Sequence, residues 1–346
     1  MTIHQDHLII KSALKQSVER TPVWVMRQAG RYLPEYREVR QKAGNFLNLC
    51  MDSDMATEVS IQPIDLVGVD AVIMFSDILT PLMGMGMDLT FNPAPKFANP
   101  VRTEADIDRL ELKDPDEATP YVGEILRKLQ QQLNGRVPVI GFAGAPFTLA
   151  CYMVEGQGSK LFSLTKTMFW DKPAMAKKLM DKLTRMTIDY LKYQIDNGAQ
   201  LIQLFDSWAG ILSPEDHAAF ALPYTSQIFE ELGNYSDIPK IYYINGSHHL
   251  LQQMASSGAD VVSLDWTTDI AEAKELIGDQ VALQGNLDPN ILFCNEEVIE
   301  EKVADIINKV GKGGGHIFNL GHGIDKNVNP DRLRYMVNAV KRLSAV

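Results

Sequence analysis

Two arginines close to the start of the chain are the residues whose spacing most clearly points to chemistry. Arg27 and Arg31 follow the apolar segment 22–26. A guanidinium is costly to bury unless it is paired, so two of them after an expected strand indicate a mouth that receives anions. The alternative is that they pair with neighbouring acids such as Glu35 and Glu38, since paired structural arginines are common.

One carboxylate stands in an apolar setting. Asp77 follows the apolar segment 71–75 and precedes Ile78 and Leu79. A carboxylate among apolar residues needs hydrogen-bond donors. We therefore expect Asp77 to lie in a partly apolar pocket and to accept N–H groups.

Other polar residues follow expected strands without a unique interpretation. His322 stands between two glycines, which fits either a loop histidine or a phosphate-binding turn. Tyr152 could be a core aromatic with its hydroxyl at the surface. Ser207 lacks the Gly-x-Ser-x-Gly surroundings of a nucleophile. Asp77, Asp206, Asp265 and Asp288 could assemble a magnesium site, but each could equally cap a helix.

The elements that must position these residues alternate along the whole chain. Nearly continuous apolar runs, typical of strands covered on both faces, occur at 23–26, 71–75, 137–142, 201–205, 240–244, 261–264, 281–284 and 316–320. Helical patterns separate them at 57–67, 117–133, 173–197, 214–232, 270–277, 296–310 and 330–343. Eight βα units predict an α/β fold, a (β/α)8 TIM barrel forming a single domain over 1–346. A doubly wound open sheet is the alternative, but no glycine-rich dinucleotide fingerprint follows the first strand.

Two local features refine this picture. Gly68, Gly198 and Gly258 each begin a three-residue turn before a strand, where glycine can take the left-handed conformation that ends a helix. Residues 84–120 break the regular spacing with many prolines and acids, and we expect a long loop excursion over the barrel mouth.

Composition limits the possible partners. The net charge of −11 and the pI of about 5.2 argue against nucleic-acid and anionic-membrane binding. The three cysteines, Cys50, Cys151 and Cys294, form neither a disulfide framework nor a zinc pattern. The first seven residues lack a signal peptide, and no apolar run reaches a membrane span. We therefore expect a soluble protein of the reducing cytoplasm.

Two long motifs resemble signatures of the uroporphyrinogen decarboxylase family. The first is WVMRQAGRYLPEY at 24–36, and the second is GFAGAPFTL at 141–149 followed by YMVEG at 152–156. FSDIL at 75–79 and NLGHGI at 319–324 fit the same family. The resemblance implies a (β/α)8 barrel, usually a homodimer without metal or cofactor. Such an enzyme removes four acetate carboxyls from uroporphyrinogen III, giving coproporphyrinogen III and carbon dioxide in haem and tetrapyrrole biosynthesis.

The resemblance also implies roles for the matching residues of this sequence. Substrate carboxylates would be bound by Arg27 and Arg31, beside a wall of Gln28, Ala29 and Gly30. Asp77 would face the pyrrole N–H groups at the centre. The remaining polar contacts would be Tyr152, Ser207 and His322. Asp77 and Arg27 would be the catalytic pair, with the proton coming from Arg27, from a water near it, or from His322 or Tyr152.

Two other functions remain open from the sequence. Zinc-dependent methyl transfer to a thiol shares this barrel, but it needs histidine and cysteine ligands, and no cysteine stands near Asn245-Gly246-Ser247-His248. A non-catalytic tetrapyrrole-binding protein could carry the same arginines and the same aspartate.

Overall fold

Seven parallel strands form one curled sheet in the computed structural model, which describes residues 6–346. Their order in the sheet is β1-β4-β5-β6-β7-β8-β9. The bounds are β1 (Val72–Ile73), β4 (Val139–Gly144), β5 (Leu201–Asp206), β6 (Lys240–Ile244), β7 (Val261–Ser263), β8 (Ala282–Gln284) and β9 (His316–Ile317). All of these strands fall inside or overlap the predicted apolar runs. The α/β barrel prediction is therefore confirmed.

The eighth predicted strand, 23–26, is reduced to a single bridge. Val23 pairs with Phe318 beside β9, and its carbonyl accepts the N–H of Asp70 at 2.7 Å, just before β1. The segment thus lies between the two ends of the sheet and closes the barrel. Beyond this bridge, side-chain hydrogen bonds also hold the segment in place. The amide of Gln28 accepts from Val25 N at 3.1 Å and donates to Ala71 O at 2.9 Å, which joins the closing segment to the β1 edge.

The three repeated glycine turns share one pairing. Gly68, Gly198 and Gly258 all have positive φ, as expected. Two residues after these glycines stand Asp70, Gln200 and Asp260. The backbone N–H of each one donates to the carbonyl of a strand residue, and its side chain accepts the N–H of that strand residue. The three strand residues are Val23, Val139 and Lys240. The repeated motif therefore docks the start of each strand onto its neighbour.

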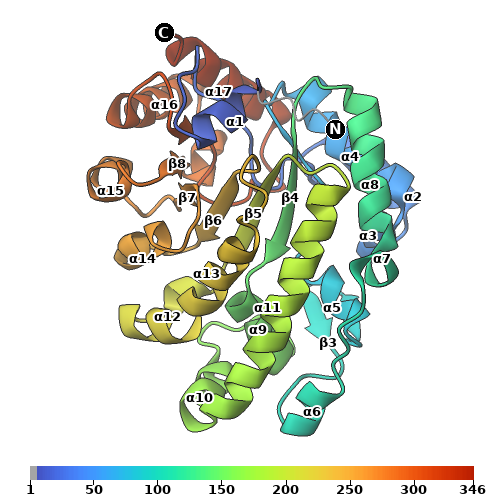
Figure 1. Ribbon diagram of the computed structural model, residues 1–346. Helices are drawn as coiled ribbons and strands as arrows, with labels where there is room; N and C mark the ends of the chain where they lie inside the picture. Colours follow the sequence, from blue (N-terminus) through green and yellow to red (C-terminus); the bar gives the residue numbers. More distant parts are fainter. Residues whose placement is uncertain (1–5) are drawn as a thin grey trace.

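Helices surround the sheet (Figure 1). The outer layer consists of α4 (Ser53–Leu66), α8 (Pro120–Leu133), α11 (Pro173–Asp196), α12 (Pro214–Phe220), α13 (Leu222–Glu231), α14 (Leu251–Ala255), α15 (Ile270–Ile277), α16 (Glu296–Val310) and α17 (Pro330–Leu343). The helix predicted at 214–232 is divided at Ala221, because Pro223 has no N–H to continue the first helix and instead starts the second. No helix in the described part of the chain is long and apolar enough to cross a membrane.

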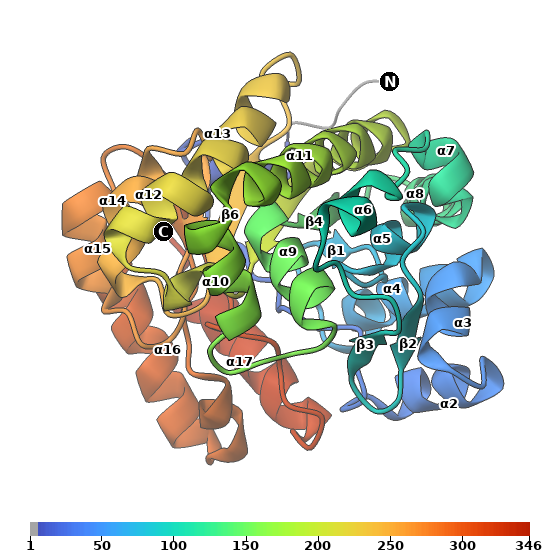
Figure 2. The ribbon, with the colours of Figure 1, turned by 90° about the horizontal axis from the view of Figure 1, so that it is seen from below.

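Shorter elements cover the end of the barrel to which the strands point (Figures 1 and 2). They include α5 (Thr80–Gly84), α9 (Pro146–Glu155) and α10 (Ser163–Asp171). At the side, α2 (Pro34–Lys42) and α3 (Phe46–Met51) pack against α4. The 3-10 turns η1 (Ala209–Ile211), η2 (His248–Leu250) and η3 (Pro289–Phe293) follow β5, β6 and β8 in the chain. Residues 84–120, expected as a loop, hold a hairpin of β2 (Leu89–Phe91) and β3 (Pro95–Phe97) with α6 (Glu104–Asp108) and α7 (Pro115–Ala118). The hairpin joins the end of α9, since Phe97 N donates to Gly156 O at 2.7 Å.

The opposite end of the barrel is closed by α1 (Leu8–Ala13), which packs against β8 and β9. Ile9, Ile10 and Ala13 join a buried cluster with Trp24 and Ile317. The mouth where the strands end is therefore the end of the barrel at which a ligand can meet polar side chains.

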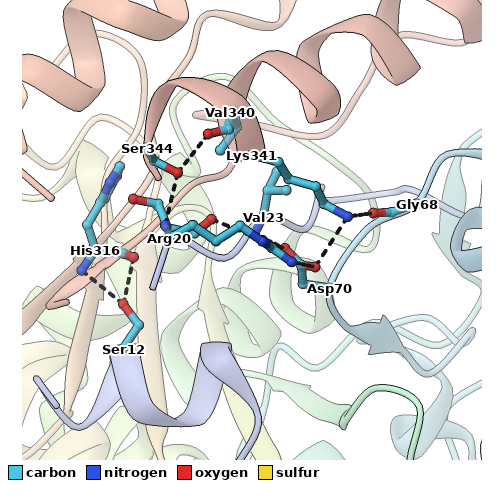
Figure 3. Close-up of polar contacts among 10 residues, drawn as sticks. Ser12, Arg20, Val23, Gly68, Asp70, His316, Val340, Lys341 and Ser344 are labelled. Atoms are coloured by element: carbon cyan, nitrogen blue, oxygen red, sulfur yellow. Dashed lines mark hydrogen bonds and ion pairs between the residues drawn. The ribbon is translucent and has the colours of Figure 1, made fainter. Parts of the chain in front are cut away.

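A polar seam at this closed end anchors the segment that carries the arginines (Figure 3). Asp70 receives two hydrogen bonds from Arg20, at 2.7 and 2.8 Å, and one from Val23 N at 2.9 Å. Lys341 of α17 lies 3.5 Å from the same carboxylate. Because Arg27 lies only four positions after Val23, fixing the start of this segment also limits where Arg27 can lie.

Candidate active site

Arg27 adopts a backbone conformation that is unusual for its residue type. Its φ is 62°, in the left-handed region, which costs a non-glycine residue about 1–3 kcal/mol. The turn is held by Gln28 N, which donates to Val25 O at 2.9 Å, and by Ile324 N, which donates to Met26 O at 3.1 Å. Strain of this kind persists where surrounding structure imposes it, and here it directs an arginine at the barrel mouth.

Arg27 and Arg31 are both exposed in the structure. Neither has an acidic side chain within ion-pair distance anywhere in residues 6–346, so the expected alternative of pairing with Glu35 or Glu38 is wrong. Arg31 stands in the turn before α2, and its carbonyl accepts from Arg37 at 3.0 Å. The two cations are therefore available to an anionic ligand.

The three residues between the arginines have different roles. Gln28 is fully buried, and its side-chain amide and its carbonyl are all engaged in the barrel seam, the carbonyl with the hydroxyl of Tyr32 at 2.8 Å. Its side chain therefore supports the wall from within the barrel seam. Ala29 and Gly30 are half-buried. A Cβ on Gly30 would lie 2.7 Å from Arg27 O, so the turn has no room for one.

Asp77 follows β1 and is half-buried. One carboxylate oxygen accepts Leu79 N at 2.9 Å, and its carbonyl accepts the hydroxyl of Thr80 at 2.9 Å. Burial raises the pKa of Asp77 to about 6, against smaller lowering effects of the Leu79 N–H and of the charge of Arg27. The second carboxylate oxygen has no partner within residues 6–346, so Asp77 can still accept N–H donors from a ligand.

Arg27, Asp77, Tyr152 and His322 lie close enough to interact electrostatically. Burial raises the pKa of Tyr152 and lowers that of His322, and the charge of Arg27 lowers the pKa of both. Asp77 in turn raises the pKa of Tyr152. Four of the residues expected at the site therefore come together at one mouth, although they are separated by up to 295 positions in the chain.

Aromatic side chains form two walls of this mouth. Tyr152, on α9, meets the ring of Trp208 edge to face at 6.0 Å between centroids. Ser207, next to Trp208, is half-buried. His322 meets Trp266 edge to face at 6.1 Å. Neither tryptophan was anticipated from the sequence, because a lone tryptophan after a strand carries no chemical signature.

Gly323 provides the space in which Arg27 lies. A Cβ at position 323 would come within 2.3 Å of Arg27 Cδ and 2.7 Å of its Cγ and Nε. The sequence pattern Gly-His-Gly suggested a phosphate cradle as one alternative, but this glycine accommodates a cationic side chain.

A Gly323→Ala substitution is expected to displace Arg27 without unfolding the barrel, because the clash is with one exposed side chain. We expect the affinity for an anionic ligand to fall about tenfold, the effect of losing roughly one charged hydrogen bond. Binding of the ligand and thermal unfolding should be measured together. Gly158→Ala, where an added Cβ has no neighbour within 4 Å, is the matched control. Equal affinity in the two variants would contradict the role assigned to Gly323.

The other strand-end acids have structural partners. Asp265 is buried and accepts Gly246 N and Ser247 N at 2.7 and 2.9 Å, which joins two loops of the mouth. Asp288 caps η3 through Asn290 N at 2.8 Å, and Asp206 is buried behind the wall. Across residues 6–346 no three His, Cys, Asp or Glu side chains gather as a metal site requires.

The fold and the site together define a class of protein: a (β/α)8 barrel whose mouth presents Arg27, without an acidic partner in residues 6–346, beside a half-buried aspartate. The same fold occurs in a methyltransferase from Methanosarcina mazei, with a TM-score of 0.82 and 18% identity over 96% of this chain and 97% of that one. At this identity the likeness shows the fold alone.

Sequence comparison identifies the family. Residues 4–343 match the family model described as uroporphyrinogen decarboxylase. A uroporphyrinogen decarboxylase of Trichlorobacter lovleyi is 50% identical over 94% of this chain and 96% of its own length. The one from Syntrophotalea carbinolica is 46% identical over 98% of both chains. The chain belongs to the uroporphyrinogen decarboxylase family, as its motifs indicated.

Proposed function

We propose that this chain decarboxylates uroporphyrinogen III at all four acetate side chains, giving coproporphyrinogen III and carbon dioxide. The observation that carries the proposal is the proximity of a cation without an ion-pair partner in residues 6–346, Arg27, to a half-buried carboxylate, Asp77, at the mouth of the barrel. The substrate has the complementary charge pattern, with carboxylates at its periphery and four N–H donors at its centre. Family membership supports the same assignment.

Asp77 is proposed to accept the pyrrole N–H groups and to stabilise positive charge on the ring. Protonation of a pyrrole carbon makes the ring cationic. The C–C bond to the carboxylate then breaks, its electrons flow into the ring, and carbon dioxide leaves. A proton adds to the resulting methylene carbon as the ring carbon loses its own, so each acetate becomes a methyl group with net uptake of one proton. An ionised Asp77 lowers the energy of the cationic stage.

Arg27 and Arg31 are proposed to hold carboxylates of the substrate, since a guanidinium can bind a carboxylate through two parallel hydrogen bonds. Tyr152, Ser207 and His322 contribute further polar contacts. Of the candidate acids, His322 is favoured in its neutral form, because burial and the charge of Arg27 lower its pKa. Burial raises the pKa of Tyr152. These shifts lower the population of protonated His322 and make Tyr152 a weaker acid. We propose a water held by Arg27 as the proton donor.

The decisive experiment is to incubate the purified chain with uroporphyrinogen III under reducing conditions, and to measure carbon dioxide and the porphyrin products. We expect heptacarboxylate, hexacarboxylate and pentacarboxylate intermediates, followed by the tetracarboxylate product. Binding without release of carbon dioxide would instead support a non-catalytic tetrapyrrole-binding protein. Stoichiometric zinc together with methyl transfer to a thiol would support the methyltransferase alternative.

The value of kcat/KM is expected to fall as the pH decreases through about 6. The pKa of Asp77 is raised to about 6 in the free protein, so the carboxylate is ionised above this pH and neutral below it. Asp206 has a pKa raised to a similar value by burial. The acid limb should therefore persist in an Asp206→Asn variant. If the limb disappears in that variant, the titrating group is not Asp77.

We also propose, from family membership, that the chain acts in the cytoplasm as a homodimer. Sedimentation equilibrium at the protein concentrations of the assay should give twice the chain mass of 38.7 kDa. A monomer that is fully active would reject the dimer as the working unit.

A further inference from the structure

An unpartnered donor lies in the wall of the mouth. The Nε1 atom of Trp208 is buried and makes no hydrogen bond of ordinary length within residues 6–346, although it lies near enough to the Tyr152 hydroxyl to lower its pKa. Its ring is held between Tyr152, with centroids 6.0 Å apart, and Phe162, with centroids 4.8 Å apart. A buried indole N–H without a partner costs about 1–3 kcal/mol. Because this donor lies beside a predicted substrate contact, Tyr152, it could form its hydrogen bond when a ligand is bound.

A buried hydrogen-bond chain holds the backbone of Trp208 in place. Thr148 Oγ1 lies 2.6 Å from Asp206 Oδ1, and Trp208 N lies 3.1 Å from the same hydroxyl oxygen. An ionised carboxylate can only accept, so Thr148 must give its single proton to Asp206. The hydroxyl oxygen is then free to accept from Trp208 N. Tyr242 completes the anchor, with its hydroxyl 3.2 Å from the other carboxylate oxygen.

A hydrogen bond from the indole N–H of Trp208 would fix the direction in which the Tyr152 hydroxyl points its own proton. A phenol hydroxyl donates one hydrogen bond and accepts others. Burial raises the pKa of Tyr152, which keeps this hydroxyl protonated, while the nearby indole N–H of Trp208 lowers that pKa. If the phenol oxygen accepts from the indole, its own proton must point elsewhere, and the open mouth is where an anionic ligand would lie.

We propose that Trp208 is a positioning residue: its indole N–H donates to the Tyr152 hydroxyl when a ligand is bound, and so aims the phenol proton at a carboxylate of the ligand. This inference rests on the proposed function for the identity of that ligand. It does not require Trp208 to touch the reacting atoms. The anchor of Thr148 and Asp206 holds the indole in reach of Tyr152.

A double-mutant cycle with Tyr152→Phe tests the inference. Trp208→Phe keeps an aromatic ring against Tyr152 and Phe162 but removes the N–H. We expect it to lower kcat/KM about fivefold in the wild-type background, the value of one ordinary hydrogen bond. In the Tyr152→Phe background the same substitution should have no effect, because the hydroxyl that it orients is absent.

Trp170→Phe is the matched control, since that indole is 55% exposed on α10 and donates to Asp216 on the outer surface. Equal losses from Trp208→Phe in both backgrounds would show a packing role or a direct substrate contact and would overturn the inference. No loss from Trp208→Phe in the wild-type background would overturn it as well.

The inference and the proposed function can fail separately. If the wild-type chain releases no carbon dioxide from uroporphyrinogen III, the proposed function fails. The same four proteins can then be titrated with uroporphyrin, which carries the same carboxylates, using the shift of its absorption band. A fivefold loss of affinity that depends on Tyr152 would still support the positioning role, and an effect independent of Tyr152 would reject it.

Discussion

An Asp77→Asn variant is expected to lose decarboxylation by about 10³-fold or more while unfolding at a higher temperature than the wild type. The loss follows because a neutral amide cannot stabilise a cationic pyrrole ring, and removal of one preorganised electrostatic group typically costs 10²–10³-fold. The amide also presents an N–H donor to the pyrrole N–H groups. Both effects act on the chemical step, so kcat should fall more than KM rises.

The gain in stability has a separate cause. The pKa of Asp77 is raised to about 6 in the folded chain, from 3.8, so ionisation of this carboxylate opposes folding. The destabilisation develops as the pH rises from about 4 to about 6 and is complete at pH 7. Two pKa units correspond to about 2.7 kcal/mol, and partial exposure reduces this to about 1–2 kcal/mol. The advantage of the variant should vanish near pH 4, where both proteins carry a neutral side chain.

These expectations can be measured by single-turnover kinetics and by denaturant unfolding at pH 7 and pH 4. Asp288→Asn is the matched control, because its side chain caps η3 and asparagine caps equally well. That variant should match the wild type in both assays. Near-normal turnover by Asp77→Asn would remove Asp77 from the proposed mechanism. A variant less stable than the wild type at pH 7 would show that the carboxylate is better satisfied than its single Leu79 contact suggests.

An Arg27→Lys variant is expected to lose about 10- to 100-fold in kcat/KM although it keeps the positive charge. Lysine places a compact ammonium on a flexible chain and cannot form the paired hydrogen bonds of a guanidinium. Losing one such charged hydrogen bond costs about 1.5–3 kcal/mol of binding free energy. Both residues must adopt the left-handed backbone at position 27, so the comparison isolates the head group.

Steady-state kinetics should show the loss mainly in KM if Arg27 only binds the substrate, and in kcat as well if it holds the proton-donating water. Arg136→Lys is a suitable control, since Arg136 pairs with Asp65 on the exposed surface. It should leave the kinetics unchanged. If Arg27→Lys behaves like this control, the guanidinium geometry is irrelevant and the proposed clamp is wrong.

Several elements could be predicted because their signals are local. The helices at 270–277, 296–310 and 330–343 have the predicted bounds, since each shows an apolar face and a capping residue. The strand at 240–244 was predicted to the residue. The hairpin at 89–97 was missed, because two three-residue strands separated by a short turn are too short to show a period of two.

At the site, the sequence alone determined which residues are candidates for the chemistry, since a motif around Arg27, an aspartate after an apolar run and a glycine-flanked histidine can be recognised from the order of residues. Only the tertiary structure decided how these candidates are arranged. Among the residues that the structure describes, it left Arg27 and Arg31 without acidic partners. It also turned Gln28 into the barrel seam and placed Gly323 and Trp208 beside residues far away in the chain. Ion pairing, burial and close approach depend on distances in space. A barrel brings together strand ends that are far apart along the chain, and the order of residues does not specify these distances.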